Sequence, residues 1–584
     1  MLPTPSNEQR KGAIGVATAH RRNRVAIFGG GVAGMTAAHE LAERGFQVEL
    51  YERHDELGGK ARSFTYPGSG QDGRRDLPGT MGGHFFFGDA PNLGDTLARI
   101  STGADLTVRD RLSTVRIDGC LEWAGVAPVM SFPTLSNTNP LILPAALLRT
   151  LAQAMPLWKA LPASDIVLLS RKLAGLVASG EHRQWGQLEK LAFADYLGLE
   201  HLSPEGRKIA NLPDHAWLAD RHGASTRAVA QTLAVAAAGI FGRRRYGQPH
   251  VLSILDGPET EVWFTPWQRQ LERLGARFHL GHRLSELTVI DQQINGATVI
   301  TPNDETLAVN ADWYILAVPV DKAAELISAE LLAADSNLGC LKQIPLFCGL
   351  NLQIFLRHRV SRLGLLFMSY SAPWGMGNEV LSRHWNLDLA DYGDGSAREC
   401  LSVQLNDATW WSLPGMLYNK PAKDCTGPEI IDEVLAQMRR YLPDGETIFA
   451  PEAIHSVRLS PATPTRPDGL LSIDEPLLSE SPSVTRYRPH GKSQVTNLLL
   501  AGAYTRNFAT GDQMEGANES GRRAAASILA ATDSTERPVQ IESWTPPAWM
   551  RALWHYDDSR YVRGKRNLFD TRNVQSKEAS RVVR

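Results

Sequence analysis

Three glycines near the N-terminus have the spacing of a phosphate-binding turn. Gly29, Gly31 and Gly34 follow the apolar run 25–28 and open a segment with apolar residues at helical spacing. In a GxGxxG turn the first glycine permits the tight bend, the second lets backbone N–H groups approach a pyrophosphate, and the third lets helix and strand pack closely. The N-terminus of the helix adds partial positive charge toward the phosphates. This strand–turn–helix unit predicts a dinucleotide site.

A carboxylate follows at the place where such a site binds ribose. A second apolar strand is expected over residues 47–51, and it ends at Glu52. A carboxylate there can accept hydrogen bonds from both hydroxyl groups of a ribose. GxGxxG alone is a weak signal because glycine-rich turns are common, whereas strand, turn, helix, strand and acid in this order are specific. The first 52 residues therefore predict a Rossmann-like nucleotide-binding unit.

The segments beyond Glu52 resemble those of the flavoprotein superfamily that includes amine oxidases and phytoene (carotenoid) desaturases. Residues 52–63 are similar to its E-x5-GG-[R/K] signature, in which paired glycines and the adjacent base hold the pyrophosphate. Residues 76–85 resemble the loop beside the isoalloxazine ring. Residues 514–517, Met-Glu-Gly-Ala, are nearly identical to the start of the closing helix, whose N–H groups face a carbonyl of the flavin pyrimidine. The resemblance runs from about residue 24 to 532.

This resemblance implies one non-covalently bound FAD. Residues 275–284 are similar to the strand whose backbone meets the adenine, and residues 312–319 end in the family's usual Ala-x-Pro. The residues expected to contact the cofactor are Gly29, Gly31, Val32, Ala33, Gly34, Glu52, Arg53, Gly58, Gly59, Lys60, Arg62, Gly79, Thr80, Met81, Leu284, Gly502, Ala503, Gln513, Met514 and Ala517.

The order of these segments predicts an α/β protein in which a discontinuous FAD-binding domain is interleaved with a substrate-binding domain. Helical periodicity marks the first insertion, and strand-like stretches mark the second. The expected parts are a flexible tail at 1–23, FAD-binding segments at 24–120, 252–325 and 490–532, a helical insertion facing substrate or membrane at 121–251, a substrate-binding segment at 326–489, and a C-terminal extension at 533–584.

Composition excludes several classes of partner. The chain has 584 residues, and its 61 Lys and Arg nearly balance 63 Asp and Glu, so nothing favours nucleic acid. Five scattered cysteines without CxxC spacing indicate reduced packing residues, so we expect neither a disulfide frame nor a metal site. The sequence shows neither a secretory signal nor an uninterrupted apolar run of about 18 residues. We therefore expect a cytoplasmic location. The five cysteines are Cys120, Cys340, Cys348, Cys400 and Cys425.

Candidate catalytic residues are few. His84 follows the expected flavin-facing loop and could act as an acid, a base or a polar handle; Gln513 precedes the closing helix. A titratable cluster at 214–222 could equally be a solvated helix cap. Since the flavin itself accepts the hydride, the protein needs to supply little beyond orientation and at most one base. A sparse catalytic set is thus compatible with a flavin dehydrogenase.

Departures from the superfamily pattern help to choose a branch. Amine oxidases usually have an aromatic residue where this chain has Gln513, and an amide has no π-face to attract a substrate cation. They also usually carry a lysine where one register places Asn351. Carotenoid desaturases usually have Gly-Asp where this chain has Ala503-Tyr504. The first two departures disfavour oxidation of a simple amine; the third weakens the resemblance to the desaturase branch without affecting the FAD prediction.

The favoured function is dehydrogenation of a bulky apolar substrate, such as a carotenoid, another polyene or a lipid-like secondary metabolite. The alternatives are an amine or amino-acid oxidase with an atypical site, and a non-redox flavoprotein that isomerises or merely binds its ligand. Only one nucleotide fingerprint is visible, so the expected electron acceptor is oxygen or a quinone. The sequence leaves the oligomeric state open.

Residues 140–159 combine apolar faces with tryptophan and basic residues, as helices that lie in a membrane interface do. They could instead only wall the substrate cavity, and both interpretations stay open. Either one predicts a large apolar ligand. We expect an elongated apolar cavity that runs from the flavin toward residues 141–179, with Gln513 and His84 near its inner end.

Overall fold

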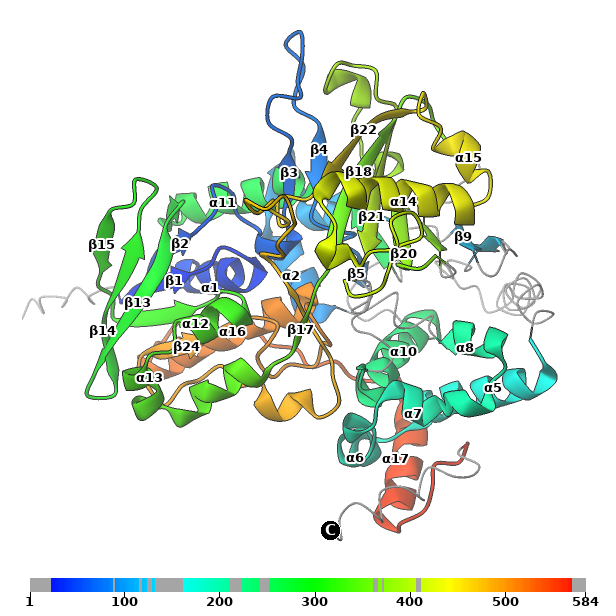
Figure 1. Cartoon of the computed structure of the whole chain (residues 1–584). Coiled ribbons are helices and arrows are strands. Elements are labelled where there is room, and N and C mark those ends of the chain that lie inside the picture. The colour runs from blue at the N-terminus through cyan, green and yellow to red at the C-terminus, as the bar shows by residue number, and fades with distance from the viewer. Residues whose placement is uncertain are drawn as a thin grey trace, which may run out of the picture.

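The computed structural model describes residues 23–87, 90–114, 118–122, 129–131, 161–210, 223–241, 252–360, 366–369, 372–405 and 411–569. Three bodies are visible in Figure 1. One contains the N-terminal strands, one contains a second sheet covered by a helix, and one is helical. The mixed helices and sheets confirm the predicted α/β class.

A five-stranded parallel sheet forms the centre of the first body, in the order β12-β2-β1-β16-β24. In β1, Val25 pairs with Val48 on one side and Trp313 on the other. Its strands β1, β16 and β24 are mostly apolar because packed elements cover both faces of the sheet. The strands are β1 (Arg24–Phe28), β2 (Gln47–Glu52), β12 (Arg277–Leu280), β16 (Trp313–Leu316) and β24 (Leu498–Leu500).

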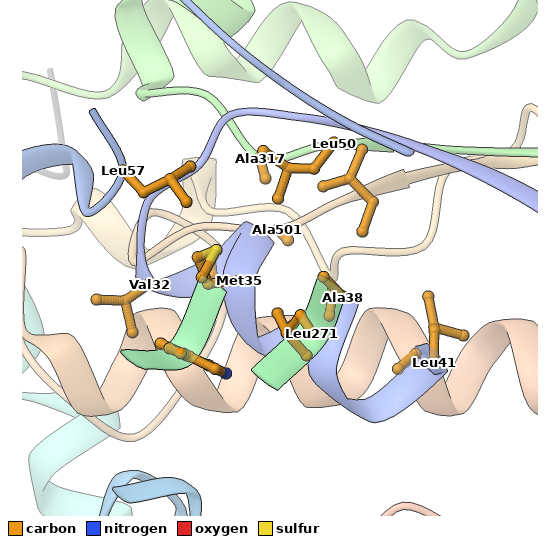
Figure 2. Close-up of a cluster of buried hydrophobic side chains, with 14 of the residues drawn as sticks. Val32, Met35, Ala38, Leu41, Leu50, Leu57, Leu271, Ala317 and Ala501 are labelled. Carbon is orange, nitrogen blue, oxygen red and sulfur yellow. The ribbon is translucent and has the colours of Figure 1, made fainter. Parts of the chain in front are cut away.

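Helices α1 (Val32–Ala42) and α16 (Met514–Ala531) pack against each other although almost 500 residues separate them. Glycine makes the close approach possible: a Cβ on Gly521 would lie 2.3 Å from the Ala33 carbonyl oxygen. Figure 2 shows apolar side chains of α1, including Met35 and Leu41, in the same cluster as Leu271. The two ends of the chain therefore share one core.

A three-stranded antiparallel sheet lies beside the parallel one (Figure 1). It consists of β13 (Arg283–Ile290), β14 (Gln293–Ile300) and β15 (Thr306–Val309). Its apolar face, with Leu287 and Val299, contributes to a core shared with β1 and β16. This sheet places His282 and Leu284 at the edge of the parallel sheet.

The second body is a seven-stranded sheet with strand order β10-β9-β19-β20-β21-β18-β22. Helix α14 (Gly427–Tyr441) covers it through an apolar face that includes Ile430, Val434 and Met438. The strands are β9 (Asp118–Glu122), β10 (Val129–Ser131), β18 (Leu350–Leu356), β19 (Leu366–Ser369), β20 (Met376–Val380), β21 (Glu399–Leu405) and β22 (Ile454–Leu459).

The expected boundary at residue 120 falls inside β9, which pairs with β19 in this second sheet. The strand pairs β9 and β10 thus belong with the segment 326–489 rather than with a helical insertion. Spacing could not indicate this, because the partner strand lies about 250 residues away in the sequence.

The helical body holds the described helices of the first insertion. Its core includes Leu169, Leu176 and Phe193. Helix α17 (Ala548–Val562), from the C-terminal extension, packs against it (Figure 1). The other helices are α5 (Ala163–Ala178), α6 (Glu181–Gly186), α7 (Phe193–Leu197), α8 (Pro204–Ala210) and α10 (Thr226–Phe241).

Candidate active site

A cavity of about 500 Å³ lies at the carboxyl ends of the parallel strands. Its wall includes Phe28 at the end of β1, Glu52 at the end of β2, Ala317 after β16 and Gly502 after β24. Ligands of open α/β sheets bind at this edge, where the strand order reverses. The volume falls within the roughly 300–1,000 Å³ of small-molecule sites.

The glycine turn forms one side of the cavity. Gly29 has a φ of +108°, and a Cβ there would lie 2.5 Å from the Ala317 carbonyl oxygen. A Cβ on Gly34 would lie 2.0 Å from the Gly29 carbonyl oxygen, so this glycine lets helix and strand meet and does not line the cavity. Gly31 lines the cavity. The three glycines have the separate roles that their spacing predicts.

Glu52 is held in place by two backbone amides. The N–H of Gly30 donates to Oε2 at 2.6 Å, and the N–H of His54 donates to Oε1 at 2.9 Å. The side chain is buried yet lines the cavity. Because each carboxylate oxygen has a second lone pair, both can still accept a hydroxyl group. The carboxylate is therefore oriented before any ligand arrives.

Arg62 does not line the cavity, contrary to the sequence-based expectation. Its guanidinium forms two hydrogen bonds with Glu475, at 2.9 and 3.1 Å, and both side chains are buried. Burial by itself would raise the pKa of Glu475, but the hydrogen bond from His54 and the charge of Arg62 hold that pKa far below its usual range. Glu475, which sequence analysis missed, therefore takes up the guanidinium that was expected to meet a phosphate.

The segment around Glu475 is tied to the other predicted cofactor residues. Arg53 lies 2.9 Å from Asp474, and Lys60 Nζ lies 2.9 Å from Asp512 and donates to the Pro476 carbonyl. Arg53 and Lys60 both line the cavity. These contacts join residues more than 400 positions apart and close the cavity on one side.

The loop that follows β4 (Pro78–Thr80) forms the far wall. Met81, Gly82, Gly83 and His84 line the cavity, whereas Gly79 and Thr80 lie behind them. Thr80 positions the turn: its hydroxyl donates to the Gly82 carbonyl at 2.7 Å. The loop expected beside the flavin ring thus lines the cavity through its second half.

Both ring nitrogens of His84 have protein partners. Nδ1 lies 2.9 Å from a Glu259 oxygen, and Nε2 lies 2.9 Å from the Lys60 carbonyl oxygen. A carbonyl oxygen only accepts, so Nε2 carries a proton. Burial lowers the pKa of His84, but the charge and hydrogen bond of Glu259 outweigh it and raise the pKa above its usual value. Direct action as a base, one role considered from the sequence, would require breaking one of these hydrogen bonds.

Glu379, on β20, lies next to this pair and was not singled out in the sequence. Its Oε1 accepts a hydrogen bond from Gln404 Nε2 at 3.0 Å. The side chain is 3% exposed, and burial raises its pKa to about 8 even though the charge of His84 opposes this shift. Gln404 lines the cavity. No local pattern could reveal Glu379, because its neighbours come from three distant segments.

Asn351, the second residue of strand β18, lines the cavity, and both ends of its amide are hydrogen-bonded. Nδ2 donates to Ser402 Oγ at 2.8 Å, and Oδ1 accepts from Gln353. Gln353 Nε2 in turn lies 2.9 Å from the Thr80 carbonyl. With its oxygen occupied, Asn351 presents a neutral amide to the cavity and supplies no base.

The closing helix α16 brings Met514 and Ala517 to the cavity, together with Gly502 and Ala503. Gln513 occupies the N-cap position of this helix without a side-chain capping bond, and it does not line the cavity, contrary to expectation; its amide donates to Thr510 Oγ1 at 3.3 Å. Its assignment as a catalytic residue therefore has no support from its position.

Fifteen of the twenty expected cofactor residues therefore line the cavity. They include the oriented carboxylate of Glu52, residues of the glycine turn and Met81 of the loop after β4. This arrangement fits an extended dinucleotide with a ring system next to the loop. Those fifteen are Gly29, Gly31, Val32, Ala33, Glu52, Arg53, Gly58, Gly59, Lys60, Met81, Leu284, Gly502, Ala503, Met514 and Ala517.

Two sequence-based expectations lie wholly or partly outside the described residues. The interfacial segment 140–159 and the titratable cluster 214–222 fall there. The apolar cavity was expected to run toward residues 141–179. Helix α5, which covers residues 163–178 of that range, does not line the cavity. Among the described helices, none combines the length and apolar character needed to cross a membrane.

The sequence profile of the family described as flavin containing amine oxidoreductase matches residues 32–529. Among curated proteins, the zeta-carotene desaturase of Arabidopsis thaliana is 25% identical, with 87% of this chain and 85% of that protein covered. The zeta-carotene desaturase of Synechocystis is 24% identical, with 87% and 97% covered.

Solved structures resemble the fold at lower sequence identity. A putrescine oxidase triple mutant superposes with a TM-score of 0.57 at 16% identity, over 87% of this chain and 99% of that chain. The similarity shows that the fold is shared over most of the present chain.

Proposed function

The chain belongs to the flavin-containing amine oxidoreductase family, and from this premise we propose that it desaturates a polyene or a similar bulky apolar substrate. It is an FAD-dependent oxidoreductase. The proposal concerns which bond it oxidises and in which class of molecule.

One observation carries the proposal: similarity to zeta-carotene desaturases extends over 87% of the chain. A match of this extent includes both the cofactor segments and the second sheet, which must supply the substrate side of the site. At 25% identity the shared reaction type is a better inference than a shared substrate, so we propose the class of polyenes rather than one compound.

Desaturation removes two hydrogens from neighbouring carbons and forms a C=C bond. One leaves as a hydride and the other as a proton to solvent. When bound, FAD would supply the hydride acceptor. The chain's own residues would hold and orient it: Glu52 at the ribose, the turn at Gly31 at the pyrophosphate, and the N-terminus of α16 at the ring.

An amine oxidase is the second candidate, because a putrescine oxidase shares the fold. Two positions argue against it. Asn351 presents a fixed amide where a basic residue would be expected, and Gln513 provides no aromatic face for a substrate cation. A non-redox isomerase is the third candidate; it would use the same cofactor without net electron transfer.

Anaerobic mixing of the purified holoprotein with substrates separates these candidates. Stoichiometric bleaching of the flavin by a polyene such as zeta-carotene, with a more conjugated product, supports the proposal. Bleaching by a diamine or amino acid with no response to polyenes would contradict it in favour of an oxidase. Product formation without bleaching would contradict it in favour of an isomerase.

We further propose that the electron acceptor is a quinone or oxygen. Only one nucleotide fingerprint occurs in the sequence, at Gly29–Gly34, which leaves no second site for a nicotinamide. Rapid mixing of the reduced protein with either acceptor measures the two rates. Reoxidation by NAD(P)+ faster than by both would contradict this part.

Peripheral contact with a membrane, from a cytoplasmic location, is also part of the proposal. Besides the sequence of 140–159, an exposed apolar tip supports it: Leu413, Met416 and Leu417 are 39–53% exposed. The buried carboxylate of Glu433 accepts hydrogen bonds from three backbone N–H groups of this tip and so holds its backbone in place.

The proposed cytoplasmic location is supported by the cysteines. The four cysteines with described side chains are free thiols, which fits a reducing compartment.

Liposome flotation tests the membrane contact. Replacing Leu147, Leu148 and Leu151 with serine should reduce binding to liposomes while the flavin content stays unchanged, because these residues lie far in sequence from the FAD segments. The triple serine variant of Leu413, Met416 and Leu417 tests the described tip separately. Equal binding by wild type and both variants would contradict the membrane contact.

A further inference from the structure

Two buried carboxyl groups and the partly buried ring of His84 meet at the loop that contains Gly82 and Gly83. Glu259 contacts His84, and Glu379 lies against the same loop. Glu259 and Glu379 are each 3% exposed. Three different parts of the chain supply them: the loop after β4, the start of the π-helix η5 (Thr260–Phe264), and β20. A π-helical turn is a costly feature that often marks a functional site, and here it presents Glu259.

The loop at Gly82 and Gly83 leaves space for the carboxyl group of Glu379 because Gly83 has no side chain. A Cβ on Gly83 would lie 1.9 Å from Oε1 and 2.3 Å from Oε2 of Glu379. The carboxyl group therefore packs directly on the backbone of Gly83, which itself lines the cavity. Gln404 adds a second link, since it lines the cavity and donates to Glu379. Glu379 thus lies one residue layer behind the cavity wall.

The charges in this cluster can be counted. His84 is the cation that faces both carboxyl groups, and Glu259 binds it directly. Lys60 contributes its carbonyl to His84, while its ammonium group pairs with Asp512. Within the described chain Glu379 has no other cation, and its Oε2 has no hydrogen-bond partner. Because Glu259 already pairs with the only cation that faces Glu379 among the described residues, an ionised Glu379 would be buried without a counter-ion of its own, and this cost favours the neutral acid.

We propose that Glu379 is a positioning residue of the flavin site and that it stays protonated. Gln404 and the Gly82–Gly83 turn then face the flavin-ring side of the cavity with a neutral group, rather than a carboxylate, behind them. The raised pKa of Glu379, about 8, agrees with this assignment. Reduction of the flavin by a hydride brings negative charge into the cavity. A neutral acid behind the wall does not oppose that charge, whereas a carboxylate would.

The role of Glu379 in catalysis rests on the proposed function. Whether Glu379 is protonated does not, and this can be tested without substrate. The variants are Glu379→Gln, which is neutral at every pH and of equal size, and Glu259→Gln, which removes the counter-ion of His84. In the second variant Glu379 becomes the partner of His84, so its proton should leave at lower pH.

Infrared difference spectroscopy of the holoprotein between pH 6 and pH 9 detects the neutral acid. We expect wild type to lose a protonated-carboxyl C=O band as the pH rises through about 8, and Glu379→Gln to lack that band. Subtracting the two spectra removes bands of other buried carboxyl groups, such as Glu515, whose pKa burial raises to about 7. In Glu259→Gln the midpoint should fall by at least one pH unit. A difference spectrum without this band would overturn the proposal.

The visible absorption of the oxidised flavin tests the link to the cavity. In wild type the spectrum should shift with the same midpoint as the infrared band, and in Glu379→Gln it should stay constant over this range. Identical pH titrations of the flavin in both proteins would overturn the positioning role even if the band is present. If Glu379→Gln does not fold, the midpoint shift in Glu259→Gln decides the question.

With a polyene substrate, the rate of flavin reduction in wild type should decline above pH 8 and remain flat in Glu379→Gln. If polyenes fail to reduce the flavin while the two spectroscopic results hold, the proposed substrate class is wrong and the role of Glu379 stands. If polyenes reduce the flavin but the two spectroscopic results fail, the proposed substrate class stands and the role of Glu379 is wrong.

Discussion

Glu52 is the residue whose side chain is best prepared for the cofactor. Two backbone amides orient its carboxylate, and both oxygens retain a lone pair toward the cavity. Glu52→Ala removes the ribose acceptor and should weaken FAD binding by about 1.5–3 kcal/mol, or roughly 10- to 150-fold in Kd. Fluorescence titration of apoprotein with FAD measures this change.

The exposed Glu286→Ala on β13 is the matched control, because it removes an equal charge outside the cavity. Its Kd should equal that of wild type. An unchanged Kd in Glu52→Ala would mean that this carboxylate does not hold the ribose.

Glu379 should also make the stability of the protein depend on pH. Its pKa is about 8 in the folded protein and near 4.5 when unfolded, so between these values only the folded state holds the proton. The stability that this group contributes is complete below pH 4.5 and decreases by roughly 1.4 kcal/mol per pH unit up to about pH 8. Glu379→Gln lacks this term.

Thermal melts of wild type and Glu379→Gln over pH 5–8 check this expectation. The Tm of wild type should fall relative to that of the variant as the pH rises. Parallel curves for the two proteins would show that Glu379 has an ordinary pKa in the folded state.

At the scale of elements, helix α2 (Pro91–Arg99) depends on a cap supplied from another helix. Its own N-cap, Ala90, has no side-chain acceptor. Instead Glu515, in the first turn of α16, accepts the N–H groups of Asn92 and Leu93 at 3.1 and 2.8 Å. The acid of the Met-Glu-Gly-Ala motif thus joins two helices and does not itself line the cavity.

Glu515→Ala should destabilise the protein by about 2 kcal/mol, because it leaves buried N–H groups of α2 without an acceptor. Urea unfolding measures the loss. Glu536→Ala, at an exposed position in the C-terminal extension, serves as control and should have no effect. Equal stabilities of the two variants would contradict the capping role.

At the scale of the whole molecule, the C-terminal extension fastens the helical body. Asp557 on α17 accepts from Arg183 at 2.8 Å and from the N–H of Gly180 at 3.0 Å. It also accepts from Asn567 at 3.1 Å, and its side chain is buried. The described part of the chain beyond residue 529, where the family match ends, is therefore packed into the folded structure up to residue 569.

Asp557→Asn should leave the buried guanidinium of Arg183 unpaired, at a cost of about 3–5 kcal/mol. The loss should be local, since the FAD domain has its own core. Hydrogen exchange should thus speed up in α5, α6 and α17 while the flavin stays bound. The exposed Asp533→Asn is the control. Faster exchange in α1 and β1 as well would mean that the bodies unfold together.

The sequence by itself determined the nucleotide-binding unit and the cofactor class. Gly29, Gly31 and Gly34 are recognisable because each needs the absence of a side chain for a local reason. Glu52 follows at a spacing imposed by one strand–helix–strand unit. Requirements of this kind act between near neighbours in the chain, so they leave a readable pattern of residue types.

Only the tertiary structure decided how charges are shared around the cavity. Arg62 and Glu475 are 413 residues apart, and His84 and Glu259 are 175 apart. In the sequence alone, nothing distinguishes Arg62 from an arginine that binds a phosphate, or Glu379 from any other glutamate in a strand. Their roles depend on burial and on which opposite charge is nearest, and both quantities are set by contacts between distant segments. The spacing of neighbouring residues cannot indicate such contacts, because the two charged partners lie far apart in the sequence.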